Sequence, residues 1–207
     1  MIEVLPGVFH WSTFHEGIGA TVHSYLLASL EAPVLLDPRM PESGIAAIAK
    51  LAHPQLILLT NRLHYRHSGR FANYFGASIH AHRAGAHAFG PRRHRVRLFD
   101  HGANLPSRIR ALKVGAICPE ETAFLLPISG GILSLGDAVI REGRRLSFVD
   151  DELMGENPEG VKRGLRRSLG ELLKQRFDHL LLAHGKPWIG GAKKALRDFL
   201  GYTSAHQ

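Results

Sequence analysis

The hydrophobic positions of the chain fall into short apolar runs separated by polar breaks. Continuous apolar runs over Gln55–Thr60 and Asp178–Ala183 are typical of strands that are covered on both faces of a sheet. Apolar residues three to four positions apart predict an amphipathic helix over Pro158–Arg176 and another over Gly191–Phe199. Strands that alternate with helices predict an α/β fold.

The remaining pattern adds shorter elements on either side of a polar loop that is rich in histidine and arginine, Asn61–Gly69. Turn residues separate these elements, which is typical of hairpins and short crossovers. The predicted strands are Val4–Trp11, Thr21–Ala28, Pro33–Asp37, Ser78–Ala81, Thr122–Pro127 and Gly131–Leu135, and the predicted helices are Glu42–Leu51 and Ser68–Phe75. We find no internal repeat and no linker, so we expect one domain over residues 1–207.

Composition narrows the class of protein. Of the 207 residues, 44% are hydrophobic and 21% are charged, which excludes a disordered chain. The single cysteine, Cys118, excludes a disulfide framework and a cysteine-based zinc module. No apolar stretch approaches the roughly 20 residues of a membrane helix. The first residues, Met1–Val4, lack the basic start of a signal peptide, so we expect a cytoplasmic protein with no membrane association.

Charge indicates the kind of partner. Lys and Arg number 26 against 18 Asp and Glu, a formal net charge of +8, which favours anionic partners. The basic run Arg92–Arg97 lacks the interleaved aromatic residues that would stack on bases. We therefore expect a small anionic substrate or ligand rather than nucleic acid, and a homodimer is an open alternative.

Four polar residues follow predicted strands. His64 and His67 come after the strand at residues 55–60, Asp137 after that at 131–135, and His184 after that at 178–183. Residues at the carboxyl ends of strands converge at one edge of an α/β sheet. Imidazoles together with a carboxylate suit a cation such as Zn²⁺, Mn²⁺ or Fe²⁺. The pattern predicts a site for one divalent metal.

Four longer segments carry a resemblance to a known family. They are HSYLL…VLLDP within residues 22–38, ILLTNRLHYRHSG at 57–69, FLLPISGGILSLGDAVI at 124–140 and LLLAHGKP at 180–187. In order and spacing they resemble the metallo-β-lactamase-fold superfamily. The resemblance implies a four-layer αββα sandwich whose metal site lies at one edge of the two sheets.

The metal-binding loop departs from the family pattern, a strand followed by T-H-x-H-x-D-H-x-G. Aligned on His67, the loop matches the family at His64 and His67, but Arg62 stands in place of the first His and Arg66 in place of the Asp. A further family His would fall near residues 116–118, where this chain has none. The resemblance therefore implies a divergent member with a degenerate metal-binding loop.

Two hypotheses follow from this comparison. In the first, the protein is a hydrolase of an ester, thioester, lactone or amide with a reduced, mononuclear site. The metal ligands would be His67, Asp137 and His184, with His64 as a fourth ligand or a general base, and Arg62 or Arg66 would bind the anion of the substrate or stabilise negative charge.

In the second hypothesis the protein binds no metal. An arginine stays charged and cannot ligate a cation. Arg62 and Arg66 would then pair with Asp137 and take the place of the metal charge. The cleft would hold an anionic small molecule, and the protein would be a binding or regulatory module.

Overall fold

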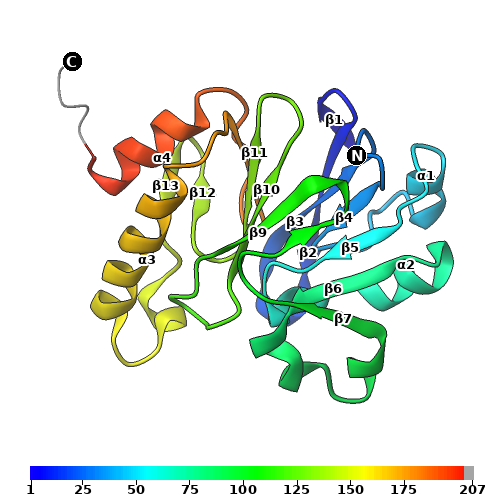
Figure 1. Cartoon of the computed structure of the whole chain (residues 1–207), viewed down its shortest axis with the longest axis horizontal. Coiled ribbons are helices and arrows are strands. Elements are labelled where there is room, and N and C mark those ends of the chain that lie inside the picture. The colour runs from blue at the N-terminus through cyan, green and yellow to red at the C-terminus, as the bar shows by residue number, and fades with distance from the viewer. Residues whose placement is uncertain (203–207) are drawn as a thin grey trace.

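Two β-sheets lie face to face between two layers of helices (Figure 1). The structure is a computed structural model that describes residues 1–202. The helices α1 (Ile45–Ala49) and α2 (Ser68–Phe75) cover one sheet, and α3 (Pro158–Leu172) and α4 (Ala192–Leu200) cover the other. The α/β class and the αββα sandwich expected from the resemblance are confirmed.

The first sheet has seven strands in sequence order. Strands β1 to β4 are antiparallel neighbours, and β4 to β7 are parallel. The strands are β1 (Ile2–Leu5), β2 (Val8–His15), β3 (Ala20–Leu27), β4 (Val34–Leu36), β5 (Leu56–Leu58), β6 (Ser78–His82) and β7 (Val96–Phe99). The parallel pairs place the carboxyl ends of β4 and β5 side by side, which is where the polar loop begins.

The second sheet has five strands in the order β14-β11-β10-β9-β8. Strand β14 runs parallel to β11, and the other pairs are antiparallel. The strands are β8 (Asn104–Leu105), β9 (Ile109–Lys113), β10 (Thr122–Leu126), β11 (Ile132–Leu135) and β14 (His179–Leu182), and a separate hairpin is formed by β12 (Ile140–Glu142) and β13 (Arg145–Ser147).

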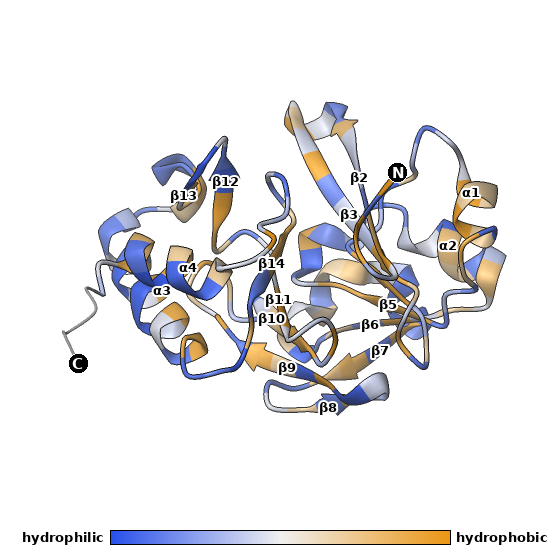
Figure 2. Cartoon of the chain, turned by 90° about the horizontal axis from the view of Figure 1, so that it is seen from above, coloured by the Kyte–Doolittle hydropathy of each residue, from blue (hydrophilic) through white to orange (hydrophobic). Residues whose placement is uncertain are grey.

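Alternation along the strands builds a core in three layers. Leu58 and Phe124 face the layer between the sheets, whereas Ile57 faces α1 and α2, and Ala123 faces α3 and α4. Successive strand residues point to opposite faces, so one apolar run fills two layers. Figure 2 shows this arrangement, with hydrophobic residues along the strands and hydrophilic ones gathered on α3.

Several predicted elements differ from those observed. The strand expected over Val4–Trp11 is two strands, because Gly7 turns the chain with φ +70° and approaches Ser29 so closely that a Cβ would lie 2.5 Å away. The helix expected over Glu42–Leu51 is confined to α1. Strands β7, β9, β12 and β13 were not predicted, because charged residues interrupt their short apolar patterns.

No helix within residues 1–202 combines the length and the apolar character that crossing a membrane requires.

Candidate functional site

Three side chains converge where the carboxyl ends of strands from the two sheets meet. His64 lies on the 3₁₀ turn Arg62–Tyr65 after β5, Asp137 follows β11, and His184 follows β14. The Nε2 atoms of His64 and His184 lie 3.2 and 3.1 Å from the same oxygen, Oδ1 of Asp137. Ligand atoms around a tetrahedral zinc, each ~2.0–2.1 Å from it, are about 3.3 Å apart. The three groups are therefore spaced as ligands of one cation.

The buried carboxylate of Asp37, at the end of β4, orients His64. Its Oδ2 lies 3.0 Å from Nδ1 of His64 and accepts a 2.6 Å hydrogen bond from Oγ of Thr60. Its Oδ1 accepts from the backbone N–H of Thr60 at 2.9 Å. Metal-binding histidines ordinarily donate their second ring nitrogen to such a carboxylate. This contact leaves Nε2 of His64 directed at Asp137.

Two carboxylates set the charge of His64. Burial alone would lower the pKa of His64, but Asp137 and Asp37 outweigh burial and raise it to about 9. Burial would raise the pKa of Asp137, yet His64 and His184 hold it well below its usual range. In the metal-free protein at neutral pH, His64 is therefore protonated between two anions.

Asn61 and Glu121 hold the other side of Asp137. The amide of Asn61 donates to Oδ2 of Asp137 at 2.8 Å and to Glu121 at 2.9 Å. Oε1 of Glu121 accepts from the backbone N–H of Asp137 at 2.8 Å. Burial, with the nearby charge of Asp137, raises the pKa of Glu121 to about 8. With Oδ2 bound by the amide, Oδ1 of Asp137 is left facing the two histidines.

The two arginines of the loop lie in different surroundings. Arg62 forms an ion pair with Glu120 rather than with Asp137. Arg66 is half-buried, and its Nη1 donates 2.8 Å hydrogen bonds to the backbone oxygens of His23 and Asp37. Within residues 1–202, neither guanidinium is hydrogen-bonded to Asp137. The direct pairing expected from the sequence is therefore not what the structure has.

His67 lies outside the cluster of His64, Asp137 and His184. Its Nδ1 accepts a 2.9 Å hydrogen bond from the backbone N–H of Met40. The cause is the backbone at Arg66, where φ of 41° and ψ of −117° turn the chain before α2 begins. Of the four expected ligands the structure brings three together and places His67 elsewhere.

Sequence analysis missed three polar residues that surround the cluster: Asp37, Asn61 and Glu121. Asp37 carries the same signal as Asp137, a carboxylate directly after a buried strand. Glu121 directly precedes the buried strand β10, and its charge stands out in an apolar neighbourhood. Position relative to a strand was therefore a usable signal for two of the three.

Comparison with known proteins gives matches in structure alone. No family model matches the chain, and no curated protein matches it. The DIM-1 metallo-β-lactamase superposes with a TM-score of 0.70 at 16% identity, covering 96% of this chain and 95% of that one.

Two further structures match over most of this chain. A metallo-β-lactamase family protein from Thermus thermophilus has a TM-score of 0.66 at 20% identity, covering 97% of this chain and 80% of that one. A flavo di-iron protein from Thermotoga maritima has a TM-score of 0.64 at 14% identity, covering 93% of this chain and 57% of that one. The chain therefore has the metallo-β-lactamase fold, at a large distance in sequence from these structures.

Proposed function

We propose that the protein is a metal-dependent hydrolase with a mononuclear site, in which His64, Asp137 and His184 hold one Zn, Fe or Mn ion. The observation that carries this proposal is the orientation of His64. Asp37 binds its Nδ1, and its Nε2 meets Oδ1 of Asp137 at the spacing of two metal ligands. A site with three protein ligands and an open position is the arrangement of catalytic zinc.

The chain's own residues would prepare this site. Asp37 and Thr60 hold the ring of His64, and Asn61 holds the carboxylate of Asp137, so the ligands need little rearrangement. When bound, the cation would supply Lewis acidity and lower the pKa of a water molecule. That chemistry suits hydrolysis of an ester, thioester, lactone or amide.

A small anionic substrate is supported by the surroundings of His184. Lys186 follows it by two residues. After burial, the charges that lower the pKa of His23 include those of His184 and Lys186, so both side chains lie near that residue. Arg66 is half-buried and donates hydrogen bonds to backbone oxygens. We therefore assign the contact with the substrate anion to Lys186, with Arg66 fixing the loop that carries His64.

The protonated state of His64 favours one alternative, a metal-free binding or regulatory module. There the charge between Asp37 and Asp137 would come from His64 itself rather than from Arg62 and Arg66. The cleft would then hold an anionic small molecule without turning it over.

Metal content separates the two functions. We would purify the protein without chelators, measure metals by plasma mass spectrometry, and compare His184→Ala with His87→Ala, the same change at an exposed histidine. The hydrolase requires about one Zn, Fe or Mn per chain in the wild type and in His87→Ala, and loss of it in His184→Ala. No metal in the wild type, even after adding Zn²⁺ or Mn²⁺, would refute the hydrolase.

Asp137→Ala gives a second, independent readout. In the hydrolase this change abolishes metal binding and the hydrolysis of ester and thioester test substrates. In the metal-free module it leaves the protonated His64 without one of its two anions, so the main effect is a loss of stability. Metal content and unfolding by urea, measured on the same preparation, tell the two apart.

A further inference from the structure

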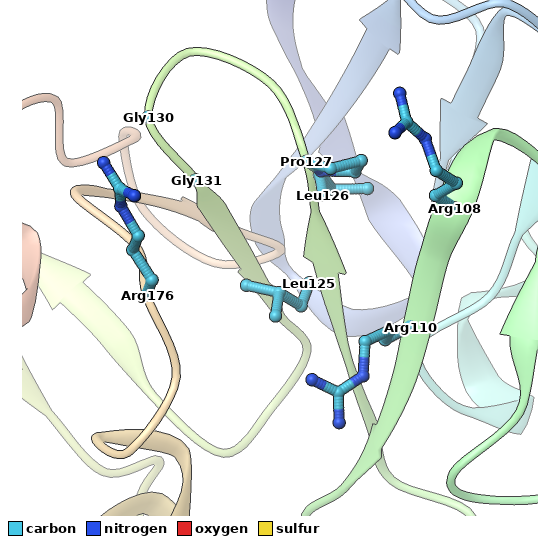
Figure 3. Close-up of a pocket in the computed structure, with 8 residues that line it drawn as sticks. All are labelled: Arg108, Arg110, Leu125, Leu126, Pro127, Gly130, Gly131 and Arg176. Atoms are coloured by element: carbon cyan, nitrogen blue, oxygen red, sulfur yellow. The ribbon is translucent and has the colours of Figure 1, made fainter.

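A second cavity lies at the opposite end of the five-stranded sheet from the histidine cluster. Its volume is about 310 Å³, and it is lined by the β10–β11 turn, by β9 and by the segment before β14. Figure 3 shows three arginines around it, Arg108, Arg110 and Arg176. The four residues of β11 and Gly136 separate the turn from Asp137, and β11 alone spans about 13 Å. The cavity is therefore distinct from the candidate metal centre.

The charge of this cavity has one sign. Three arginines line it from two separate segments, residues 108–110 and the segment before β14, and none of the residues that line it is acidic. The nearby Asp178 is engaged elsewhere, since its Oδ1 accepts from the backbone N–H of Gly191. Arginine forks match carboxylate and phosphate oxygens in pairs. The local chemistry therefore suits an anion with several oxygens.

Arg108 lies in a tight turn with an unusual backbone conformation. Ser107 and Arg108 both have φ of 58° in the three-residue turn between β8 and β9. Glycine is the residue favoured at such a left-handed position. A non-glycine residue there costs about 1 kcal/mol or more. Tight hairpin turns favour such positive φ values, and this turn places Arg108 beside the cavity.

The other two arginines come from β9 and from the segment before β14. Arg110 donates from Nη1 to the side-chain oxygen of Gln175 at 2.9 Å. At Gly131, with φ of +104°, a Cβ would lie 2.4 Å from the backbone oxygen of Arg176. The β10–β11 turn therefore rests directly against the backbone of the segment that carries Arg176, and the exposed side chains of the three arginines line one cavity.

The floor of the cavity is apolar. Leu125 pairs with Arg110 across β9 and β10 and is half-buried, and the exposed Pro127 adds to the same wall. The side chain of Leu126 is buried between the two sheets instead. A bare inorganic anion would leave this wall in contact with water. An apolar group joined to the anion would cover it and gain from the burial.

We propose that this cavity, here called the arginine pocket (Arg108, Arg110, Arg176 and the apolar wall of Leu125 and Pro127), binds a small molecule that joins a phosphate or carboxylate group to an apolar body. The volume lies at the lower limit of known ligand pockets, so the pocket suits a small metabolite rather than a polymer. The proposal is independent of the metal centre, because no residue is shared.

The test uses phenyl phosphate and inorganic phosphate as probes, titrated by calorimetry into the whole protein. We expect saturable binding of phenyl phosphate that is several-fold tighter than that of inorganic phosphate. The double variant Arg110→Gln, Arg176→Gln should weaken it by at least about tenfold. The control Arg163→Gln, Arg167→Gln removes the same charge from an exposed part of α3 and should change it by less than about twofold.

Arg108→Gly separates a binding role from a structural one. Glycine accepts the left-handed backbone, so we expect a higher melting temperature together with weaker binding of phenyl phosphate. A gain in stability with unchanged binding would overturn the role of Arg108. Metal content measured on the same variants should stay at the wild-type value, which keeps this test apart from that of the metal centre.

Three other results would overturn the proposal. The first is an absence of saturable phenyl phosphate binding to the wild type. The second is an equal loss in the two double variants, which would reduce the effect to overall charge. The third is equal affinity for phenyl phosphate and inorganic phosphate, which would show that the pocket does not bind an apolar group.

Discussion

Two groups of buried histidines lie on the same side of the seven-stranded sheet and have opposite charge states. His64, His10 and His23 are buried to the same degree, with 5%, 6% and 6% of their surface exposed. Yet the pKa of His64 is raised to about 9, whereas those of His10 and His23 are lowered to about 4 and about 3. Burial is equal, so the neighbours decide.

The neighbours differ in sign. His64 lies between the carboxylates of Asp37 and Asp137. His10 and His23 are lowered first by burial and then by positive groups, among them Lys186 for both and Arg66 for His23. They satisfy each other instead, through a 2.7 Å hydrogen bond between stacked rings. The carboxylates around His64 favour a cation there. His10 and His23 are neutral and have no carboxylate beside them, so their surroundings do not favour one.

Among the variants that test this comparison, we expect Asp37→Ala to lower the free energy of unfolding most. The change leaves the protonated His64 with one anion and removes the acceptor for Thr60. Removing one partner of a buried ion pair costs about 3–5 kcal/mol. Urea unfolding in the presence of a chelator measures this cost, with Asp100→Ala at an exposed ion pair as the control. A loss below about 1 kcal/mol would show that Asp37 does not hold His64.

Stability as a function of pH tests both groups at once in the metal-free protein. His64 has a raised pKa, so its contribution is complete below the unfolded value of 6.5 and is lost as the pH rises through about 9. His10 and His23 have lowered pKa values, so their contribution is present above 6.5 and is lost as the pH falls through about 4 and about 3.

The melting temperature should therefore fall at alkaline pH, because His64 loses its proton, and at acid pH, because His10 and His23 gain one. His64→Ala should flatten the alkaline side and leave the acid side as it is. The alkaline loss attributable to His64 is up to about 3 kcal/mol, from the size of its shift. An alkaline side that is unchanged in His64→Ala would contradict the assignment of its charge.

A smaller effect is expected from His10→Ala. The change leaves Nδ1 of His23 without its partner inside the protein, which costs about 1–3 kcal/mol. Urea unfolding measures it, and His53→Ala at an exposed histidine is the matched control. Metal content should stay as in the wild type, since His10 is outside the cluster. Loss of metal in this variant would show that His10 and His23 belong to the same site as His64.

The smallest effect is expected from Leu63→Ser, one residue before His64. Leu63 is 69% exposed, and substitutions of this kind change stability by about 0.5 kcal/mol or less. Metal content should be unchanged, because the turn is held by the hydrogen bond from the Leu63 N–H to Asn61. Loss of metal without loss of stability would give Leu63 a role at the mouth of the site.

The sequence predicted the parts of the fold that depend on long apolar patterns. The strands β5 and β14 and the helix α3 carry continuous or periodic apolar residues and were predicted where they lie. Strands β7 and β9 are interrupted by arginines or a lysine and were not predicted, because their stability comes from pairing with neighbours distant in sequence.

The candidate site likewise has one part that the sequence predicted and one part that it did not. The convergence of His64, Asp137 and His184 followed from their position after strands, and the structure brings them together. The place of His67 did not follow, because it depends on the backbone turn at Arg66, where φ is 41°. Nor did the ion pair of Arg62 with Glu120, since the two residues are 58 positions apart.

The sequence by itself determined the layered α/β fold and the set of residues at the strand ends, because alternating apolar positions dictate which faces are buried and where strands stop. Only the tertiary structure decided which of those residues meet and what charge they carry. Asp37 and Asp137 reach His64 from different sheets, and the pKa of a buried group is set by the charges within a few ångströms of it. Those distances exist only after the two sheets have packed together.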